Sequence, residues 1–145
     1  MISVLFTGSA VVLAVTVALW YLSRGLRARG RTRIARRFPA AEVLLAETLA
    51  QSYGQQSRGV TQARGSGALA LTSGELFFLL YVPERELHIP LGSVKAVSIV
   101  RSHLGKSGGA KLLHVLFTRE GSDDAIAWRL PDPDAWKAKI DAMRA

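Results

Sequence analysis

The sequence contains no cysteine among its 145 residues. This absence excludes a thiol nucleophile, a disulfide, an iron–sulfur cluster and a zinc site with cysteine ligands. Charged residues are also missing from residues 1–23, and residues 24–37 carry seven arginines but no acid. Nearly all of the net charge of +8 therefore lies in one short tract, because residues 38–145 hold 12 basic and 11 acidic residues. This distribution disfavours nucleic-acid binding, which is typical of a broadly basic domain.

The uncharged run at residues 2–22 predicts a transmembrane helix. Its 21 residues, mostly Val, Leu, Ala and Ile, would form a helix of about 31 Å, which matches a hydrocarbon core of roughly 30 Å. A cleaved signal peptide, which would release a secreted β domain, is the competing interpretation. It is disfavoured because no basic residue precedes the run and Trp20-Tyr21 stand where a cleavage site would lie.

The residues that follow the run predict its orientation. Aromatic rings are enriched at membrane interfaces, and arginines are enriched on the cytoplasmic side. We therefore expect a single-pass protein of the plasma (inner) membrane, with its N-terminus outside and residues 24–145 in the cytoplasm. The residues expected at the membrane interface are Trp20, Tyr21, Arg24, Arg27, Arg29, Arg31, Arg33, Arg36 and Arg37.

The arginine-rich residues 23–38 are expected to form a flexible or partly helical juxtamembrane connector, since Gly25 and Gly30 interrupt helical continuity. Its guanidinium groups are expected to contact anionic lipid headgroups. Within the span, Ala10, Ala14 and Ala18 recur at a spacing of four, which makes them a candidate contact for a weak homodimer.

The remainder predicts a mainly β domain with helices. Good helix formers after Pro39 predict a helix over residues 39–53. Alternating apolar residues and turn residues then predict strands from residue 58 onward, arranged as a small antiparallel barrel or sandwich. Asp132, followed by a proline at the first helical position, predicts a closing C-terminal helix with Trp136 as its apolar anchor.

Three stretches of this domain resemble a known family. Gly-x-Leu-x-Leu-Thr at residues 67–72, the aromatic-rich strand at residues 76–82 and Leu-x-Ile-Pro-Leu-x-x-Val at residues 87–94 look like the core of bacterial GRAM and pleckstrin-homology-like (PH-like) domains. The resemblance spans roughly residues 57–145. It implies two near-orthogonal sheets closed at one end by the C-terminal helix, and a role in membrane-proximal binding or scaffolding rather than catalysis. Lipid-binding members carry basic residues between the first two strands, where this chain has Arg58 and Arg64.

Catalytic, cofactor and metal motifs are not recognised in the sequence. His88, His103 and His114 are widely separated and are expected to be partly exposed, and Asp123-Asp124 fits a hairpin loop. Gly105-Lys106-Ser107 lacks the preceding glycine and the following helix of a phosphate-binding loop. We therefore expect no enzyme, cofactor or metal. The candidate anionic-ligand patch consists of Arg101, Lys106 and Lys111.

These observations predict a membrane-anchored, cytoplasm-facing PH-like binding or scaffold module without catalysis. Its expected partners are anionic lipids, through the arginine tract, and an unidentified protein. Two alternatives stay open: the domain itself senses anionic headgroups, or the chain is an accessory subunit of a membrane enzyme or transporter.

Overall fold

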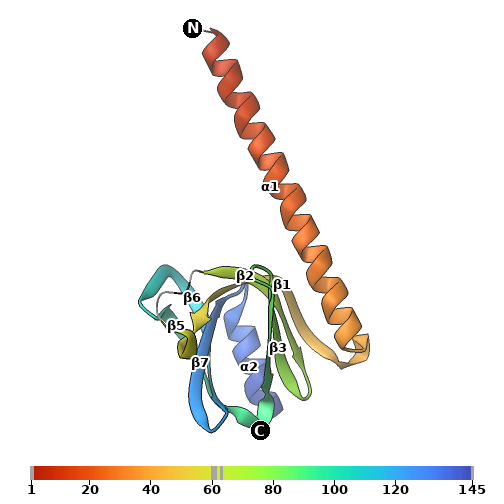
Figure 1. Cartoon of the computed structure of the whole chain (residues 1–145), viewed down its shortest axis with the longest axis vertical. Helices are drawn as coiled ribbons and strands as arrows, with labels where there is room; N and C mark the ends of the chain where they lie inside the picture. The colour runs from red at the N-terminus through yellow and green to blue at the C-terminus, as the bar shows by residue number, and fades with distance from the viewer. Residues whose placement is uncertain (1, 60–61, 63, 145) are drawn as a thin grey trace.

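The computed structural model describes residues 2–59, 62 and 64–144. A long N-terminal helix precedes seven strands, which form one antiparallel sheet in the order β4-β3-β2-β1-β7-β6-β5. A second helix ends the chain and lies within the curve of the sheet, while the first extends away from it (Figure 1). The expected combination of an N-terminal helix, an antiparallel sheet and a closing helix is confirmed. The elements are α1 (Ile2–Arg37), η1 (Ala40–Glu42), β1 (Val43–Gln55), η2 (Gln56–Arg58), β2 (Gly65–Thr72), β3 (Glu75–Leu80), β4 (Arg85–Pro90), η3 (Leu91–Ser93), β5 (Val94–His103), β6 (Lys106–Arg119), β7 (Ser122–Arg129) and α2 (Pro133–Arg144).

The main core lies between the inner face of the curved sheet and α2. Trp128 of β7 is fully buried and packs edge-on against Phe78 of β3, with the ring centroids 5.5 Å apart. Trp136 and Ile140 of α2 belong to the same cluster. The predicted helix cap is present, because Asp132 Oδ1 accepts a hydrogen bond of 3.1 Å from the backbone N–H of Ala135.

Strands β2 and β3 are buried on both faces, which explains why residues 76–79 are all apolar. Successive side chains of a strand point to opposite faces. Leu76 and Phe78 therefore join the main core. Phe77 and Leu79 face the other side, where they form a second cluster with Ile34 of α1. This second cluster packs the last part of α1 against the outer face of the sheet.

The helix expected over residues 39–53 is wrong: the structure has a single 3₁₀ turn followed by the 13-residue strand β1. This strand occupies the centre of the sheet, where it pairs with both β2 and β7. Irregular pairing between Val43 and Leu45, and again between Glu47 and Ala50, bends the strand. Intrinsic helix propensity is a weak preference, and the two ladders of backbone hydrogen bonds outweigh it here.

The connector expected at residues 23–38 is also different from the prediction. α1 continues without a break through Arg37, so residues 23–37 are helical. Two glycines inside a helix cost about 1 kcal/mol each, and packing of this segment on the sheet offsets that cost. The domain also begins earlier than residue 57, because β1 starts at Val43.

Candidate functional site

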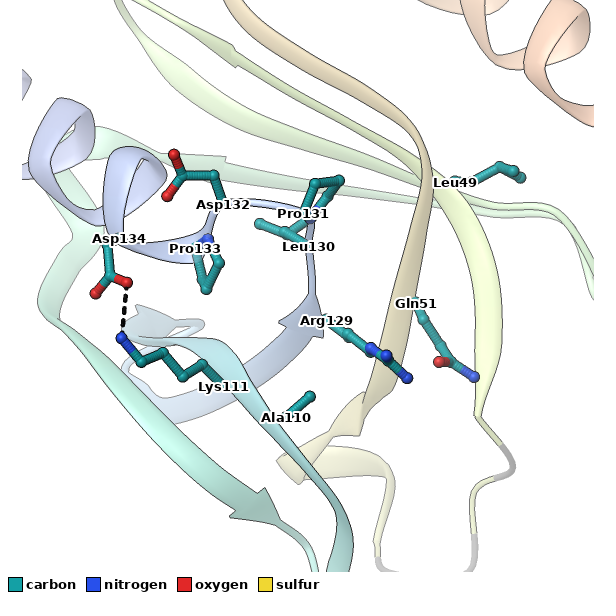
Figure 2. A pocket seen from close by; sticks show the side chains of 10 residues that line it. All are labelled: Leu49, Gln51, Ala110, Lys111, Arg129, Leu130, Pro131, Asp132, Pro133 and Asp134. Atoms are coloured by element: carbon teal, nitrogen blue, oxygen red, sulfur yellow. Dashed lines mark hydrogen bonds and ion pairs between the residues drawn. The ribbon is translucent and has the colours of Figure 1, made fainter.

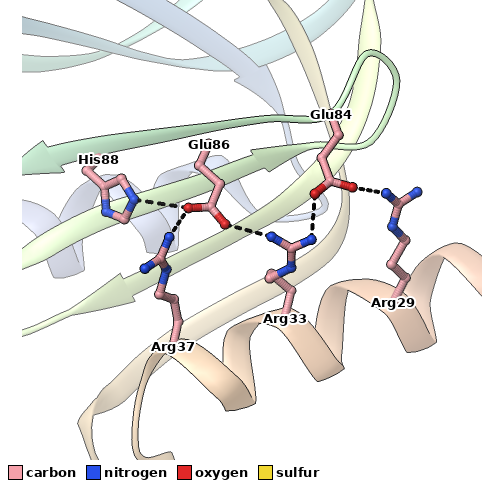
Figure 3. Close-up of polar contacts among 6 residues, drawn as sticks. All are labelled: Arg29, Arg33, Arg37, Glu84, Glu86 and His88. Carbon is pink, nitrogen blue, oxygen red and sulfur yellow. Dashed lines mark hydrogen bonds and ion pairs between the residues drawn. The ribbon is translucent and has the colours of Figure 1, made fainter.

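The C-terminal part of α1 is joined to the β3–β4 hairpin by a row of ion pairs, which we call the ladder (Figure 3). Arg29 and Arg33 contact Glu84, the latter at 2.5 Å. Arg33 also reaches Glu86 at 2.9 Å, and Arg37 contacts the other oxygen of Glu86. Each guanidinium group thus faces a carboxylate at the surface where helix and hairpin meet.

The spacing of the ladder follows from the two backbones. Arginines four residues apart on a helix repeat at about 6 Å along its axis. Glutamates two residues apart on a strand repeat at about 6.6 Å on one face. Because the repeats nearly match, Arg29, Arg33 and Arg37 meet Glu84 and Glu86 in register. This complementarity is visible in the sequence, although the sequence alone does not place the two segments together.

The charges of the ladder stabilise one another. Hydrogen bonding from Arg33 lowers the pKa of the Glu84 carboxyl. Burial alone would raise the pKa of Glu86, but hydrogen bonds from Arg37, Arg33 and His88 outweigh it and lower that pKa. Both carboxylates are therefore ionised at neutral pH, and the ladder carries three positive charges against two negative ones.

Close packing accompanies the ladder. Gly30 faces Tyr81, and a Cβ atom at position 30 would lie only 2.2 Å from Tyr81 Oη. Burial raises the pKa of Tyr81 to about 12, so its hydroxyl stays protonated and donates a hydrogen bond of 2.6 Å to the carbonyl of Thr48. Ile34 of α1 is buried in the same cluster. Residue 30 must therefore be glycine for helix and sheet to approach this closely.

The N-terminal part of α1 has a different environment. Among the described residues, one helix, within residues 8–37, is long and apolar enough by composition to cross a membrane, and its apolar window is not buried by the domain. At the end of the predicted span, the Arg24 guanidinium lies 4.5 Å from the Trp20 ring centroid, and the Trp20 and Tyr21 rings pack edge to face.

The seven juxtamembrane arginines therefore have unequal roles. Three of them form the ladder, and Arg27 lies 4.0 Å from Glu47 of β1. Arg31 and Arg36 are exposed, and Arg24 contacts Trp20. Contact of the tract with lipid headgroups stays a prediction, and Arg24, Arg31 and Arg36 are its members outside these ion pairs.

A second group of arginines, which we call the arginine pocket, gathers from three separate segments. Arg58 of η2, Arg85 of β4 and Arg119 of β6 line a small pocket of about 50 Å³. Glu86 of the ladder and apolar side chains, among them Phe78, line it too. Burial, and then repulsion from Arg58, lowers the pKa of Arg85. Among the described residues, no ion pair within 4.0 Å joins one of these three guanidinium groups to a carboxylate, although Glu86, which pairs with Arg33 and Arg37, lines the same pocket.

Asp124 fixes the segment that carries Arg58. Its buried carboxylate accepts hydrogen bonds from Gln55 Nε2 at 2.5 Å, from the Ser57 N–H at 2.9 Å and from Ser57 Oγ at 2.8 Å. Burial alone would raise the pKa of Asp124, but these bonds and one from the Ala125 N–H outweigh it and lower the pKa. The Asp124 carboxylate thus holds η2 in place. The neighbouring Asp123 is exposed and pairs with Lys95 at 2.9 Å.

A groove of about 590 Å³ lies between β1, β6 and the start of α2 (Figure 2). Lys111 lines it but pairs with Asp134 at 3.0 Å. Of the other two residues in the predicted anionic-ligand patch, Arg101 donates a hydrogen bond of 3.0 Å to the carbonyl of Gly109 in the β5–β6 hairpin, and Lys106 lies in the same hairpin. Neither lines the groove. The sequence missed the arginine pocket because its members are separated in the chain and meet only through the sheet topology.

The histidines are distributed over two places. His88 lies 3.1 Å from Glu75 and 3.4 Å from Glu86, beside the ladder. His103 is buried rather than partly exposed, and its ring packs edge to face on His114 with the centroids 5.2 Å apart. Within the described residues, no group of three His, Asp or Glu side chains is placed to hold a metal ion.

No protein-family model matches the chain, and a comparison with curated proteins finds no match either. Among solved structures, the chain is similar to the C-terminal domain of an unknown protein from Leishmania infantum. The TM-score is 0.51 and the sequence identity 16%, over 83% of this chain and 96% of that chain. At this identity the similarity shows a shared fold and carries no statement about function.

Proposed function

We propose that the chain is a single-pass membrane protein that holds a non-catalytic, PH-like binding module at the cytoplasmic face of the plasma (inner) membrane. The observation that carries this proposal is the continuity of α1. Its described apolar part, from Gly8, is not buried by the domain, while its last part is packed on the sheet. One rigid helix therefore links the predicted span to the domain. Seven antiparallel strands and a closing helix support the PH-like assignment.

The orientation follows from the charge distribution. Seven arginines follow the span within 15 residues, and such a cluster favours a cytoplasmic location for the segment that carries it. A protease added to intact cells that express the chain with a C-terminal tag tests this. We expect the tag to be protected until the cells are opened. Digestion of the tag in intact cells, or its appearance in the medium, would falsify the proposal.

A second candidate function is recognition of an anionic group by the domain. The specific observation is the arginine pocket, where three guanidinium groups and one carboxylate, that of Glu86, line the same small cavity. Guanidinium groups bind phosphate through paired hydrogen bonds. A phosphorylated headgroup is therefore the expected chemistry of the ligand. In the leading proposal the domain instead presents its surface to a protein partner.

Calorimetry on the full chain in zwitterionic nanodiscs, with inositol hexakisphosphate as the probe, separates these two functions. The pair Arg58→Gln and Arg85→Gln should abolish binding if the pocket is the site. Arg129→Gln, an exposed arginine in the groove of Figure 2, is the matched control and should leave binding unchanged. Equal loss in both variants, or no binding by the unmodified chain, would favour the protein partner.

A further inference from the structure

The β3–β4 turn, residues 81–84, carries an exposed apolar tip. Val82 is 77% exposed, and every other large hydrophobic side chain found exposed among the described residues belongs to α1. Pro83 beside it is exposed as well. An isolated exposed valine is ordinary on a protein surface. Whether Val82 has a role depends on where the β3–β4 turn lies relative to the predicted span.

The ladder holds this turn at the end of the domain that lies toward the span. Glu84 pairs with Arg29, and Glu86 pairs with Arg37 farther along α1. The strand β4 therefore runs in the same direction as α1, away from the N-terminus. The turn that precedes β4 lies at the end nearer the apolar part of the helix (Figures 1 and 3).

The depth of the turn can be placed along the axis of α1. Tyr81 contacts Gly30 and packs in one cluster with Leu26. These positions follow the end of the predicted span, Leu22, by four to eight residues, which correspond to about 6–12 Å of helix. The headgroup layer extends about 5–7 Å beyond the hydrocarbon core on each side. A turn at this level lies at the outer, water-facing edge of that layer.

The electrostatics permit this approach. A free carboxylate next to an anionic leaflet would be repelled, but both oxygens of Glu84 are paired, with Arg29 and Arg33. The ladder as a whole keeps one excess positive charge, which favours an anionic surface. The apolar side chain at the tip therefore lies beside a carboxylate whose charge is already paired.

We infer that Val82 at the tip of the β3–β4 turn contacts the headgroup layer of the same leaflet from which α1 emerges, as a second membrane contact beside the helix. This inference rests on the proposed membrane span. A second contact fixes which face of the domain is turned toward the lipid, because two attachment points restrict its rotation more than the helix alone.

Single-cysteine labelling tests the inference directly, since the chain has no native cysteine. The full chain is reconstituted in vesicles that contain headgroup spin-labelled lipid, with a fluorescent probe at Val82→Cys, Leu22→Cys or Ser73→Cys in turn. Ser73 is exposed in the β2–β3 hairpin at the opposite end of these strands. We expect strong quenching at positions 22 and 82 and little at position 73.

Each other outcome has a distinct meaning. Quenching at position 22 with equal signals at positions 82 and 73 would overturn the tip contact while leaving the span intact. No quenching at position 22 would overturn the span and the tip contact together. Gly30→Leu, which is expected to displace α1 from the sheet, should abolish quenching at position 82 and keep it at position 22. Gly25→Leu is the matched control, because a Cβ atom there meets nothing within 4 Å.

Discussion

Two sets of three arginines occupy opposite situations in this molecule. Those of the ladder lie on one helix, face carboxylates and join α1 to the domain. Those of the arginine pocket come from three segments and line one small cavity, where Arg58 repels Arg85. The comparison shows that the density of charge in a sequence does not indicate where free charge lies. The richest arginine tract is largely committed to internal contacts, whereas scattered arginines form the unpaired group.

The largest effect is expected when the support of the arginine pocket is removed. Asp124→Ala leaves the amide of Gln55 and the backbone N–H of Ser57 without their charged acceptor. Hydrogen bonds to a charged group are worth about 1.5–3 kcal/mol, so we expect a loss of about 3 kcal/mol. This corresponds to a fall in melting temperature of roughly 10 °C, which can be measured on the full chain in nanodiscs.

The neighbouring carboxylate provides the control for this prediction. Asp123→Ala removes only an exposed ion pair with Lys95, for which the expected cost is about 0–1 kcal/mol. If both variants melted alike, Asp124 would not be the support of η2. Inositol hexakisphosphate binding, if the pocket provides it, should weaken in the Asp124 variant alone.

The next effect concerns the joint between α1 and the sheet. Gly30→Leu places a side chain where Tyr81 Oη and the Cβ of Ala68 already lie, at 2.2 and 3.0 Å from the new Cβ. Overpacking of this kind costs about 1–3 kcal/mol, which α1 can avoid by leaving the sheet. Hydrogen exchange should then show loss of protection in Tyr81 and its cluster, with residues 8–22 unchanged. Gly25→Leu should behave like the unmodified chain.

A smaller effect is expected when the charges of the ladder are removed without changing its shape. Glu84→Gln combined with Glu86→Gln keeps hydrogen-bonding groups at both positions but removes the attraction for the three arginines. We expect faster exchange in residues 24–37. High salt should produce part of the same change in the unmodified chain, because it screens exposed pairs. Glu47→Gln, whose contact with Arg27 is 4.0 Å, is the control and should change little.

The sequence predicts the parts of this molecule that depend on local patterns. The apolar run, the cap at Asp132 and the alternating strands are local, and the structure agrees with them. Strand β1 was missed because its helix-forming residues are held extended by β2 and β7, which are distant in the chain. Continuity of α1 through Gly30 was missed because its cause is contact with Tyr81, 51 residues later.

The candidate sites follow the same division. The sequence shows the two halves of the ladder, as arginines at a spacing of four and glutamates at a spacing of two. It does not show that these two segments contact each other. The arginine pocket has no local signal, because Arg58, Arg85 and Arg119 share no element of structure. They meet because the sheet curves, since β4 and β6 lie five positions apart in the strand order.

The smallest effect is expected from a change of pH, which should loosen the β5–β6 hairpin before it loosens the contact between α1 and the sheet. Burial and repulsion from His114 lower the pKa of His103, and burial lowers that of His114. Both rings are therefore favoured as neutral in the folded chain. Their stability contribution is complete above the unfolded pKa of about 6.5 and declines as the pH falls below it, since the unfolded chain takes up protons first.

The ladder responds in a lower range of pH. The pKa values of Glu84 and Glu86 are lowered in the fold, so its contribution is complete above the ordinary glutamate pKa of about 4.3 and declines only below it. Between pH 7 and 5.5, the protection of β5 and β6, measured against the intrinsic amide exchange rate at each pH, should therefore fall while residues 24–37 keep theirs. His103→Gln should remove much of the pH response of the hairpin. Simultaneous loosening of both regions in this range would show that the joint depends on the histidines rather than on the ladder.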